Sequence, residues 1–397
     1  MATETKKWTV LVWIAGDNNL DEFGLKDIDE MKRVGSNDHM DIAVQFDRAG
    51  DTHTRRYHLH RDTSLDDDLV EDVGETDTGD PAVATEFFTW GIRRFPSEHV
   101  LAVLWNHGSG IDEADVYARS GSRGIAHRVV AGPVKRALFA TTVEEALGSR
   151  AIAYDDTSRD FLDNAELRKV LEDVKADTGR AIDVLGFDAC LMSMIELAYE
   201  LRDVADYSVG SEQTEPGNGW PYDRVLGPLA ERPDTTPREL AAVTVQQYVE
   251  SYQGGGEAVT LAAFDLSRAD AVKDAVDGLA GALIDALRTP DGVAAISSAV
   301  RHAQRFEMRD FADLGDFCAR LDGVDGGVAD AAQRVQDALN GGQGLVVQSG
   351  YDGDGVAGAT GAAVYLPVVG DVTVAYDKLA FASDTRWNQF LTAFKDA

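Results

Sequence analysis

The chain has 397 residues, of which 44% are hydrophobic, and its 37 Lys+Arg against 69 Asp+Glu give a formal charge of −32. This composition excludes wholesale disorder, and the charge argues against nucleic-acid binding because phosphate backbones need a basic surface. No apolar run reaches the ~18 residues of a membrane helix, and the first residues show no secretory pattern, so we expect a cytoplasmic protein without membrane or nucleic-acid partners.

Aspartate makes up most of the acidic residues. Asp accounts for 48 of the 69 acids, whereas Lys accounts for only 10 of the 37 bases. Because the acids are spread along the chain, the composition favours a halophilic protein with an acidic surface. At molar salt the Debye length falls to ~3 Å, which screens the repulsion between like charges. The alternative is an acidic surface that recruits basic partners.

Apolar runs alternate with amphipathic stretches along the chain. In chain order, the periodicity predicts a strand at 8–14, a helix at 21–34, a strand at 41–46, a helix at 81–94, a strand at 100–105, a helix at 163–176, a strand at 181–187, a helix at 191–201 and a strand at 258–264. Asp80 and Pro81 form the capping pattern of the helix at 81–94. Strands that are apolar on both faces and separated by helices indicate an α/β fold with a mainly parallel sheet.

The remaining segments indicate one continuous domain with a helical extension. The stretch 267–340 is predicted to be mostly helical, and 344–349 with 362–366 a closing strand pair. The segment 116–150 carries six bases and two acids, a local excess of positive charge in a strongly acidic chain. Its small and polar residues predict an exposed, mobile loop.

Two of the predicted strands end in residues that can carry chemistry. The strand at 100–105 is followed by Asn106, His107 and Gly108, and the strand at 181–187 by Asp188 and Cys190. Carboxyl ends of parallel strands meet at one edge of the sheet, so His107 and Cys190 should lie together. A neighbouring imidazole and the start of the helix predicted after Cys190 would both favour the thiolate. The N–H groups of Gly108 and Cys190 could then form an oxyanion hole.

Each of these features also has a plain structural explanation. A lone Cys at a strand end is usually a small buried hydrophobe, and His-Gly is often a turn. Cys318, the second of only two cysteines, is interpreted as a packing residue, and two thiols make no disulfide framework. His53, His58 and His60 could line one side of a hairpin and hold a metal, but no ligand at suitable spacing joins them, and we predict no metal site.

Several motifs in order resemble a known family. The stretches 105–110 (WNHGSG) and 188–192 (DACLM) resemble the two catalytic motifs of the clostripain family of cysteine peptidases, in the caspase-like clan. Further similar stretches lie at 13–20, 155–167, 211–222, 311–314 and 363–367, so the resemblance covers about 8–367. It implies a caspase-like three-layer α/β/α sandwich with a mainly parallel central sheet and a helical C-terminal extension. The peptidase domain would span 8–370, with its helical part at 267–340, and a strand and helix at 371–397 would pack on it.

The resemblance also assigns roles. Cys190 matches the nucleophile, His107 the general base, and Asp188 the acid at the base of a pocket that accepts Arg and, less well, Lys. A carboxylate suits a guanidinium because the fork binds both oxygens. Alternatively, Asp188 shares a face with Cys190 in an extended backbone and would orient His107. Asn106 stands where the family often carries Asp.

The family matures by cutting itself after a basic residue between the His and Cys strands. This implies an activation loop at 111–150, with its self-cleavage site at one of Arg119, Arg123, Arg128, Lys135, Arg136 and Arg150. It also implies a monomer or a nicked two-chain form. The substrates would be proteins or peptides that contain Arg or Lys. No cofactor is expected. Some relatives are stimulated by calcium, but the 352–355 turn lacks the loop length and closing Glu of a helix–loop–helix site, and calcium stays an open question.

Two other functions are compatible with the sequence. The chain could be a catalytically silent binding scaffold, against which the intact pair of His107 and Cys190 argues. It could also be a thiol amidase that acts on small molecules.

Overall fold

The computed structural model describes residues 5–50, 53–110, 152–155, 158, 160–324, 327–340, 342–368 and 376–397. The predicted activation loop at 111–150, with all six candidate self-cleavage residues, lies outside this description.

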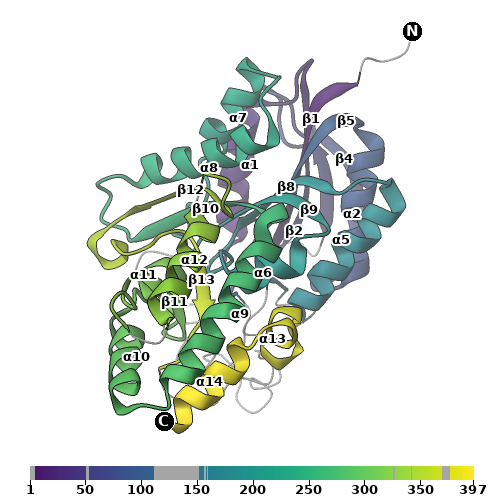
Figure 1. The fold of residues 1–397 in the computed structure, drawn as a ribbon. Helices are drawn as coiled ribbons and strands as arrows, with labels where there is room; N and C mark the ends of the chain where they lie inside the picture. Colours follow the sequence, from purple (N-terminus) through teal and green to yellow (C-terminus); the bar gives the residue numbers. More distant parts are fainter. Residues whose placement is uncertain are drawn as a thin grey trace.

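A nine-stranded sheet forms the centre of the described part of the chain (Figure 1). Its strands are, in spatial order, β12 (Val346–Asp352), β10 (Val259–Asp265), β9 (Ala205–Gly210), β8 (Ile182–Asp188), β5 (Ser97–Trp105), β1 (Lys6–Gly16), β2 (Met40–Arg48), β3 (Thr54–His58) and β4 (Leu69–Gly74). The five from β9 to β2 are parallel, and both edges are antiparallel. The predicted α/β fold with a mainly parallel centre is confirmed.

Helices cover both faces of this sheet, which makes three layers (Figure 1). One face packs on α1 (Asp21–Val34), α7 (Tyr222–Glu231) and α8 (Pro237–Tyr252), and the other on α2 (Pro81–Arg94), α5 (Asn164–Thr178) and α6 (Ile195–Leu201). Alternate residues of β1 enter the two cores: Leu11 and Trp13 on one side, Val10 and Val12 on the other. This alternation explains why the central strands are apolar at consecutive positions.

The chain beyond β10 is mainly helical, as predicted. Its elements are η1 (Leu266–Arg268), α9 (Ala269–Ala286), α10 (Pro290–His302), β11 (Phe311–Asp313), α11 (Leu314–Ala319), α12 (Val328–Asn340), η2 (Asp354–Val356), β13 (Ala363–Tyr365), η3 (Tyr376–Lys378), α13 (Ala380–Asp384) and α14 (Trp387–Asp396). A separate short pair is formed by β6 (Ile152–Asp155) and β7 (Asp160–Leu162). The described residues 376–397 are helical, and α14 packs along α9.

The predicted closing strand pair is wrong. β12 is a half-buried edge strand antiparallel to β10, whereas β13 is buried and pairs with β11 in a second small sheet. Both segments are strands, but each finds its hydrogen-bond partner elsewhere in the fold. Local periodicity predicts that a strand forms and not which strand it joins.

Two side chains of helix α6 form hydrogen bonds with the C-terminal part of the chain. Glu196 on α6 accepts a hydrogen bond from the Tyr365 backbone N–H (2.8 Å), and Tyr199 donates to Asp384 (2.8 Å). Glu196 is fully buried, and burial raises its pKa from 4.5 to about 7. Between these two values the native state keeps a proton that the unfolded chain releases, so stability falls as pH rises through this window.

Glu196→Gln is therefore expected to remove this loss while keeping the oxygen that accepts from Tyr365. The pKa difference of 7 − 4.5, or about 2.5 units, corresponds to about 3 kcal/mol in the free energy of unfolding above pH 7. Thermal unfolding followed by circular dichroism from pH 4 to 9 measures it, with the exposed Glu172→Gln as control. Parallel pH profiles for wild type and Glu196→Gln would contradict the prediction.

In the described residues, no helix combines the length and the apolar character that a membrane crossing requires.

Candidate active site

The ends of β5 and β8 bring the two predicted catalytic residues to one place. The parallel register pairs Trp105 with Asp188, so the strands end at the same level. His107 and Cys190 each follow two residues later, beyond the carboxyl ends of their strands. The Asn106 N–H continues the pairing by donating to the Asp188 carbonyl (3.4 Å). The two side chains therefore emerge at the same rim of the sheet.

Gly108 lies directly against the backbone of Cys190. A Cβ at this position would lie 2.5 Å from the Cys190 carbonyl oxygen, 3.1 Å from its nitrogen and 2.9 Å from Ala189 Cβ. Two of these contacts are with backbone, which cannot rotate aside, so only glycine allows the His107 loop to approach this closely. The close approach sets the residue after His107 against Cys190.

The thiol of Cys190 is buried and meets the loop that follows β9. The Glu215 N–H donates to Sγ (3.0 Å), and the Glu215 carbonyl oxygen lies 3.9 Å from the same atom. An N–H directed at sulfur favours the charged form of a thiol, because a hydrogen bond to the thiolate stabilises it. This N–H from a distant loop was not predicted, since nothing in local spacing connects 190 with 215.

The predicted helix at 191–201 is present, but its start directly after Cys190 is wrong. Helix α6 begins at Ile195, and the residues between are irregular, with Leu191 in the left-handed region (φ 65°). The Leu191 N–H donates to the Gln213 carbonyl (3.2 Å), so this turn is tied to the loop after β9 rather than to a helix. The thiol therefore does not lie at a helix N-terminus, and the Glu215 N–H is the donor that meets it instead.

The imidazole of His107 is buried, with 3% of the residue exposed, and contacts the turn after β1. Its Nε2 lies 2.9 Å from Asn19 Oδ1. Asn106 does not face the thiol, because its side chain donates to the Ala15 carbonyl at the end of β1 (2.6 Å). Sequence reasoning missed Asn19, although the polar run 17–19 directly after an apolar strand was a visible signal.

Asp188 is fully buried, and its carboxylate has two hydrogen-bond donors from the stretch 211–222. The Tyr222 hydroxyl lies 2.9 Å from Oδ2 and the Trp220 N–H 3.4 Å. The charges of Asp188, Glu215 and Cys190 all act on the buried Tyr248 hydroxyl and, after burial itself, raise its pKa well above 10. Two buried acids, Asp188 and Glu215, thus lie near Cys190.

A second pair of buried carboxyl groups, Glu212 and Asp313, forms hydrogen bonds that hold the loop after β9. Glu212 accepts from the Gly361 N–H (3.0 Å), and Asp313 accepts from the side chain of Thr360 (2.9 Å). Burial and the proximity of Asp313 raise the pKa of Glu212, and burial also raises the pKa of Asp313. This pair anchors the Glu215-bearing loop to the β11–β13 sheet.

The other residues considered from the sequence lie elsewhere. His53, His58 and His60 each contact a different carboxylate, and in the described part of the chain no three side chains form a metal-binding group. Cys318 is buried in α11, where burial raises the pKa of its thiol. Both features are compatible with packing roles.

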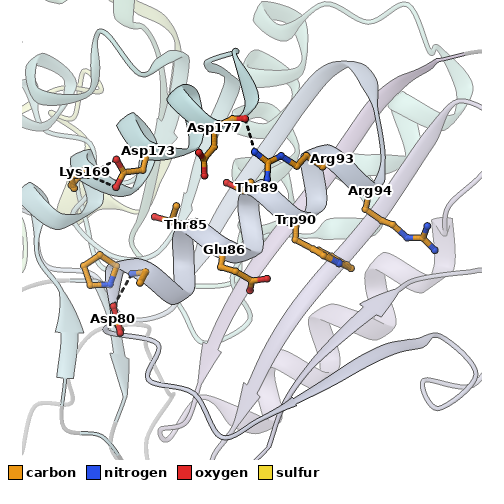
Figure 2. Close-up of a pocket in the computed structure, with 12 residues that line it drawn as sticks. Asp80, Thr85, Glu86, Thr89, Trp90, Arg93, Arg94, Lys169, Asp173 and Asp177 are labelled. Carbon is orange, nitrogen blue, oxygen red and sulfur yellow. Dashed lines mark hydrogen bonds and ion pairs between the residues drawn. The ribbon is translucent and has the colours of Figure 1, made fainter.

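An open groove runs between α2 and α5, away from the strand ends (Figure 2). Several of its charged side chains already have partners. Lys169 pairs with Asp173, and Arg93 donates to the Asp177 carbonyl (2.8 Å). None of the residues at the rim that carries His107 and Cys190 lines it.

Known proteins similar to this chain have one family in common. The sequence profile of the clostripain family matches residues 12–129 and 140–394. The chain is 26% identical over 326 residues to clostripain from Hathewaya histolytica. The match covers 70% of this chain and 56% of that protein. The chain thus spans little more than half of this relative's length.

Solved structures show the same fold. A secreted cysteine protease of this family from Bacteroides thetaiotaomicron, solved with an irreversible peptide inhibitor, matches with a TM-score of 0.63 and 19% identity over 99% of this chain and 100% of that one. An inactive zymogen from Parabacteroides distasonis matches with a TM-score of 0.67 and 18% identity over 96% and 99%. At these identities the likeness concerns the fold alone.

Proposed function

This chain belongs to the clostripain family of cysteine peptidases, and from that premise we propose that it is an endopeptidase that cleaves peptide bonds after Arg or Lys. The observation that carries the proposal is the close approach of Gly108 to the Cys190 backbone, which sets an imidazole and a thiol at one rim of the sheet. Thiolate–imidazole chemistry needs this arrangement.

The reaction proceeds in two steps. Cys190 Sγ attacks the carbonyl carbon of the scissile bond while His107 takes the thiol proton, and the same proton then passes to the leaving amine. This leaves an acyl-enzyme joined through Sγ. Water, deprotonated by His107, attacks that carbonyl carbon, and the carbon–sulfur bond breaks to restore the thiol. The Gly108 and Cys190 N–H groups would stabilise the oxyanion in both steps.

The preference for a basic residue is supported by charge. Asp188 and Glu215 are both buried beside Cys190, and both act on Tyr248. Two buried carboxylates would favour a cation, and the five donors of a guanidinium satisfy more acceptors than the three of an ammonium. The pocket should therefore accept Arg better than Lys.

Labelling tests the proposal directly. Incubation with an arginyl chloromethyl ketone is expected to modify Cys190 and leave Cys318 unmodified, as measured by peptide mass spectrometry. Hydrolysis of an Arg-linked fluorogenic amide should fall in proportion to the fraction of Cys190 that is modified. A chain that neither reacts at Cys190 nor hydrolyses the amide would be a silent scaffold. Hydrolysis of small amides alone would indicate a thiol amidase.

Self-cleavage is part of the same proposal. The basic segment 116–150 offers Arg and Lys side chains of the kind the pocket selects, in a chain that is otherwise acidic. We infer that one of the six candidates is cut in cis, which frees the pocket for other substrates.

The working environment follows from composition. An Asp-rich, Lys-poor chain with a charge of −32 supports function at high salt, where repulsion is screened. The unfolding temperature is expected to rise as KCl increases towards molar concentrations, and a constant or falling value would contradict this.

A further inference from the structure

The imidazole that the mechanism uses has a defined partner outside the two catalytic motifs. His107 Nε2 lies 2.9 Å from Asn19 Oδ1, and Asn19 belongs to the turn between β1 and α1. The Asn19 residue is exposed, whereas His107 is buried. The Asn19 side chain thus contacts the imidazole from the solvent side and does not pack in the hydrophobic core.

Hydrogen bonds between two Asn side chains and the backbone hold this turn in place. The Asn18 side chain accepts from the Leu20 N–H (2.9 Å) and donates to the Ala15 carbonyl (3.0 Å). Asn106, the residue before His107, donates to the same Ala15 carbonyl (2.6 Å). One carbonyl group therefore joins the turn that carries Asn19 to the loop that carries His107, which fixes the distance between the two side chains.

We propose that Asn19 is the positioning residue of His107. An amide oxygen only accepts hydrogen bonds, so its contact with Nε2 selects the tautomer with the proton on Nε2. The lone pair is then on Nδ1, which takes the Cys190 proton and later gives it to the leaving amine, while Nε2–H donates to Asn19 throughout. This inference rests on the proposed function.

The alternative orienting group is Asp188, which the sequence left open. Its carboxylate accepts from Tyr222 and the Trp220 N–H, whereas the ring of His107 contacts Asn19. Asp188 is accordingly assigned to the substrate pocket, and the orientation of the imidazole to Asn19. The two residues belong to different elements, because Asp188 ends β8 and Asn19 lies in the turn after β1.

Two substitutions with opposite electrostatic effects test this role. Asn19→Ala removes the acceptor and is expected to lower kcat by up to about 100-fold, near the lower end of what a general base contributes, with little change in KM. Asn19→Asp keeps an acceptor and adds a charge that stabilises the imidazolium. The limb of the pH–rate profile that reports the imidazole should move to lower pH in Asn19→Ala and to higher pH in Asn19→Asp.

Titration of His107 by NMR in the same variants needs no turnover, so it separates failure of this inference from failure of the proposed function. The expected result is an Nε2–H tautomer in the wild type and a mixture in Asn19→Ala. Asn388→Ala, on the distant helix α14, is the control and should change neither readout. An Asn19→Ala variant with unchanged kcat, profile and tautomer, or shifts of the same direction in both variants, would overturn the inference.

Discussion

Replacing Cys190 by alanine is expected to lower hydrolysis of an Arg-linked amide by about 10⁴-fold or more, because no covalent acyl-enzyme can form without the sulfur. The residue is buried, and loss of one sulfur atom should leave the fold intact. Steady-state rates in concentrated salt, with circular dichroism to verify folding, measure the effect. Full activity in Cys190→Ala would show that another group is the nucleophile.

Cys318→Ala is the matched control. It removes the only other thiol, which lies in α11 and not at the strand ends, so turnover should be unchanged. Mass spectrometry of wild type and Cys190→Ala after the same incubation extends the test to maturation. The wild type should yield fragments that end at a basic residue of 116–150, and Cys190→Ala should stay whole. Fragments from both proteins would identify a contaminating protease instead of self-cleavage.

Asp188→Asn is expected to reduce kcat/KM for an Arg-linked amide by about 100- to 1000-fold, the effect of removing one partner of a buried charge pair. Asn has nearly the same shape and still accepts from the Tyr222 hydroxyl, so the loss should reflect charge. The same amide with citrulline, the neutral analogue of arginine, should be hardly affected. The measured quantity is the ratio of the two kcat/KM values.

The outcome distinguishes the two roles considered for Asp188. If Asp188 binds the substrate cation, kcat/KM falls only for the Arg substrate. If it orients His107, kcat/KM falls equally for both substrates. Asp183→Asn is the control on the same strand. Asp183 accepts from the Val100 N–H at the opposite end of β8 (2.9 Å), so its substitution should leave the ratio between substrates unchanged.

Local signals explain where prediction succeeded. The helices at 21–34 and 81–94 occur at the predicted residues. For the second, Asp80 accepts from the Ala82 N–H (2.8 Å) and Pro81 begins the helix, so the whole start signal lies within three residues. Where a boundary depended on distant contacts, prediction failed, as in the turn 191–194, which is tied to the loop after β9.

Strand pairing shows the same limit. The β3–β4 hairpin at the edge was not predicted as two strands, because charged residues in both segments interrupt any apolar alternation. β12 and β13 were predicted as strands but given each other as partner. Neither the strand order nor the choice of partner is contained in a local pattern, since both depend on which faces can be buried together.

The sequence alone predicts that His107 and Cys190 follow two apolar strands, with Asp188 beside the thiol, because strand, turn and spacing are properties of neighbouring residues. The pairing of β1 with β5, which brings Asn19 to His107, follows only from the three-dimensional fold. The fold also brings the Glu215 N–H, from the loop after β9, to the sulfur, and the Tyr222 hydroxyl, from the start of α7, to Asp188. These contacts join residues between 25 and 88 positions apart, and burial of the shared core, which no local pattern describes, is what brings them together.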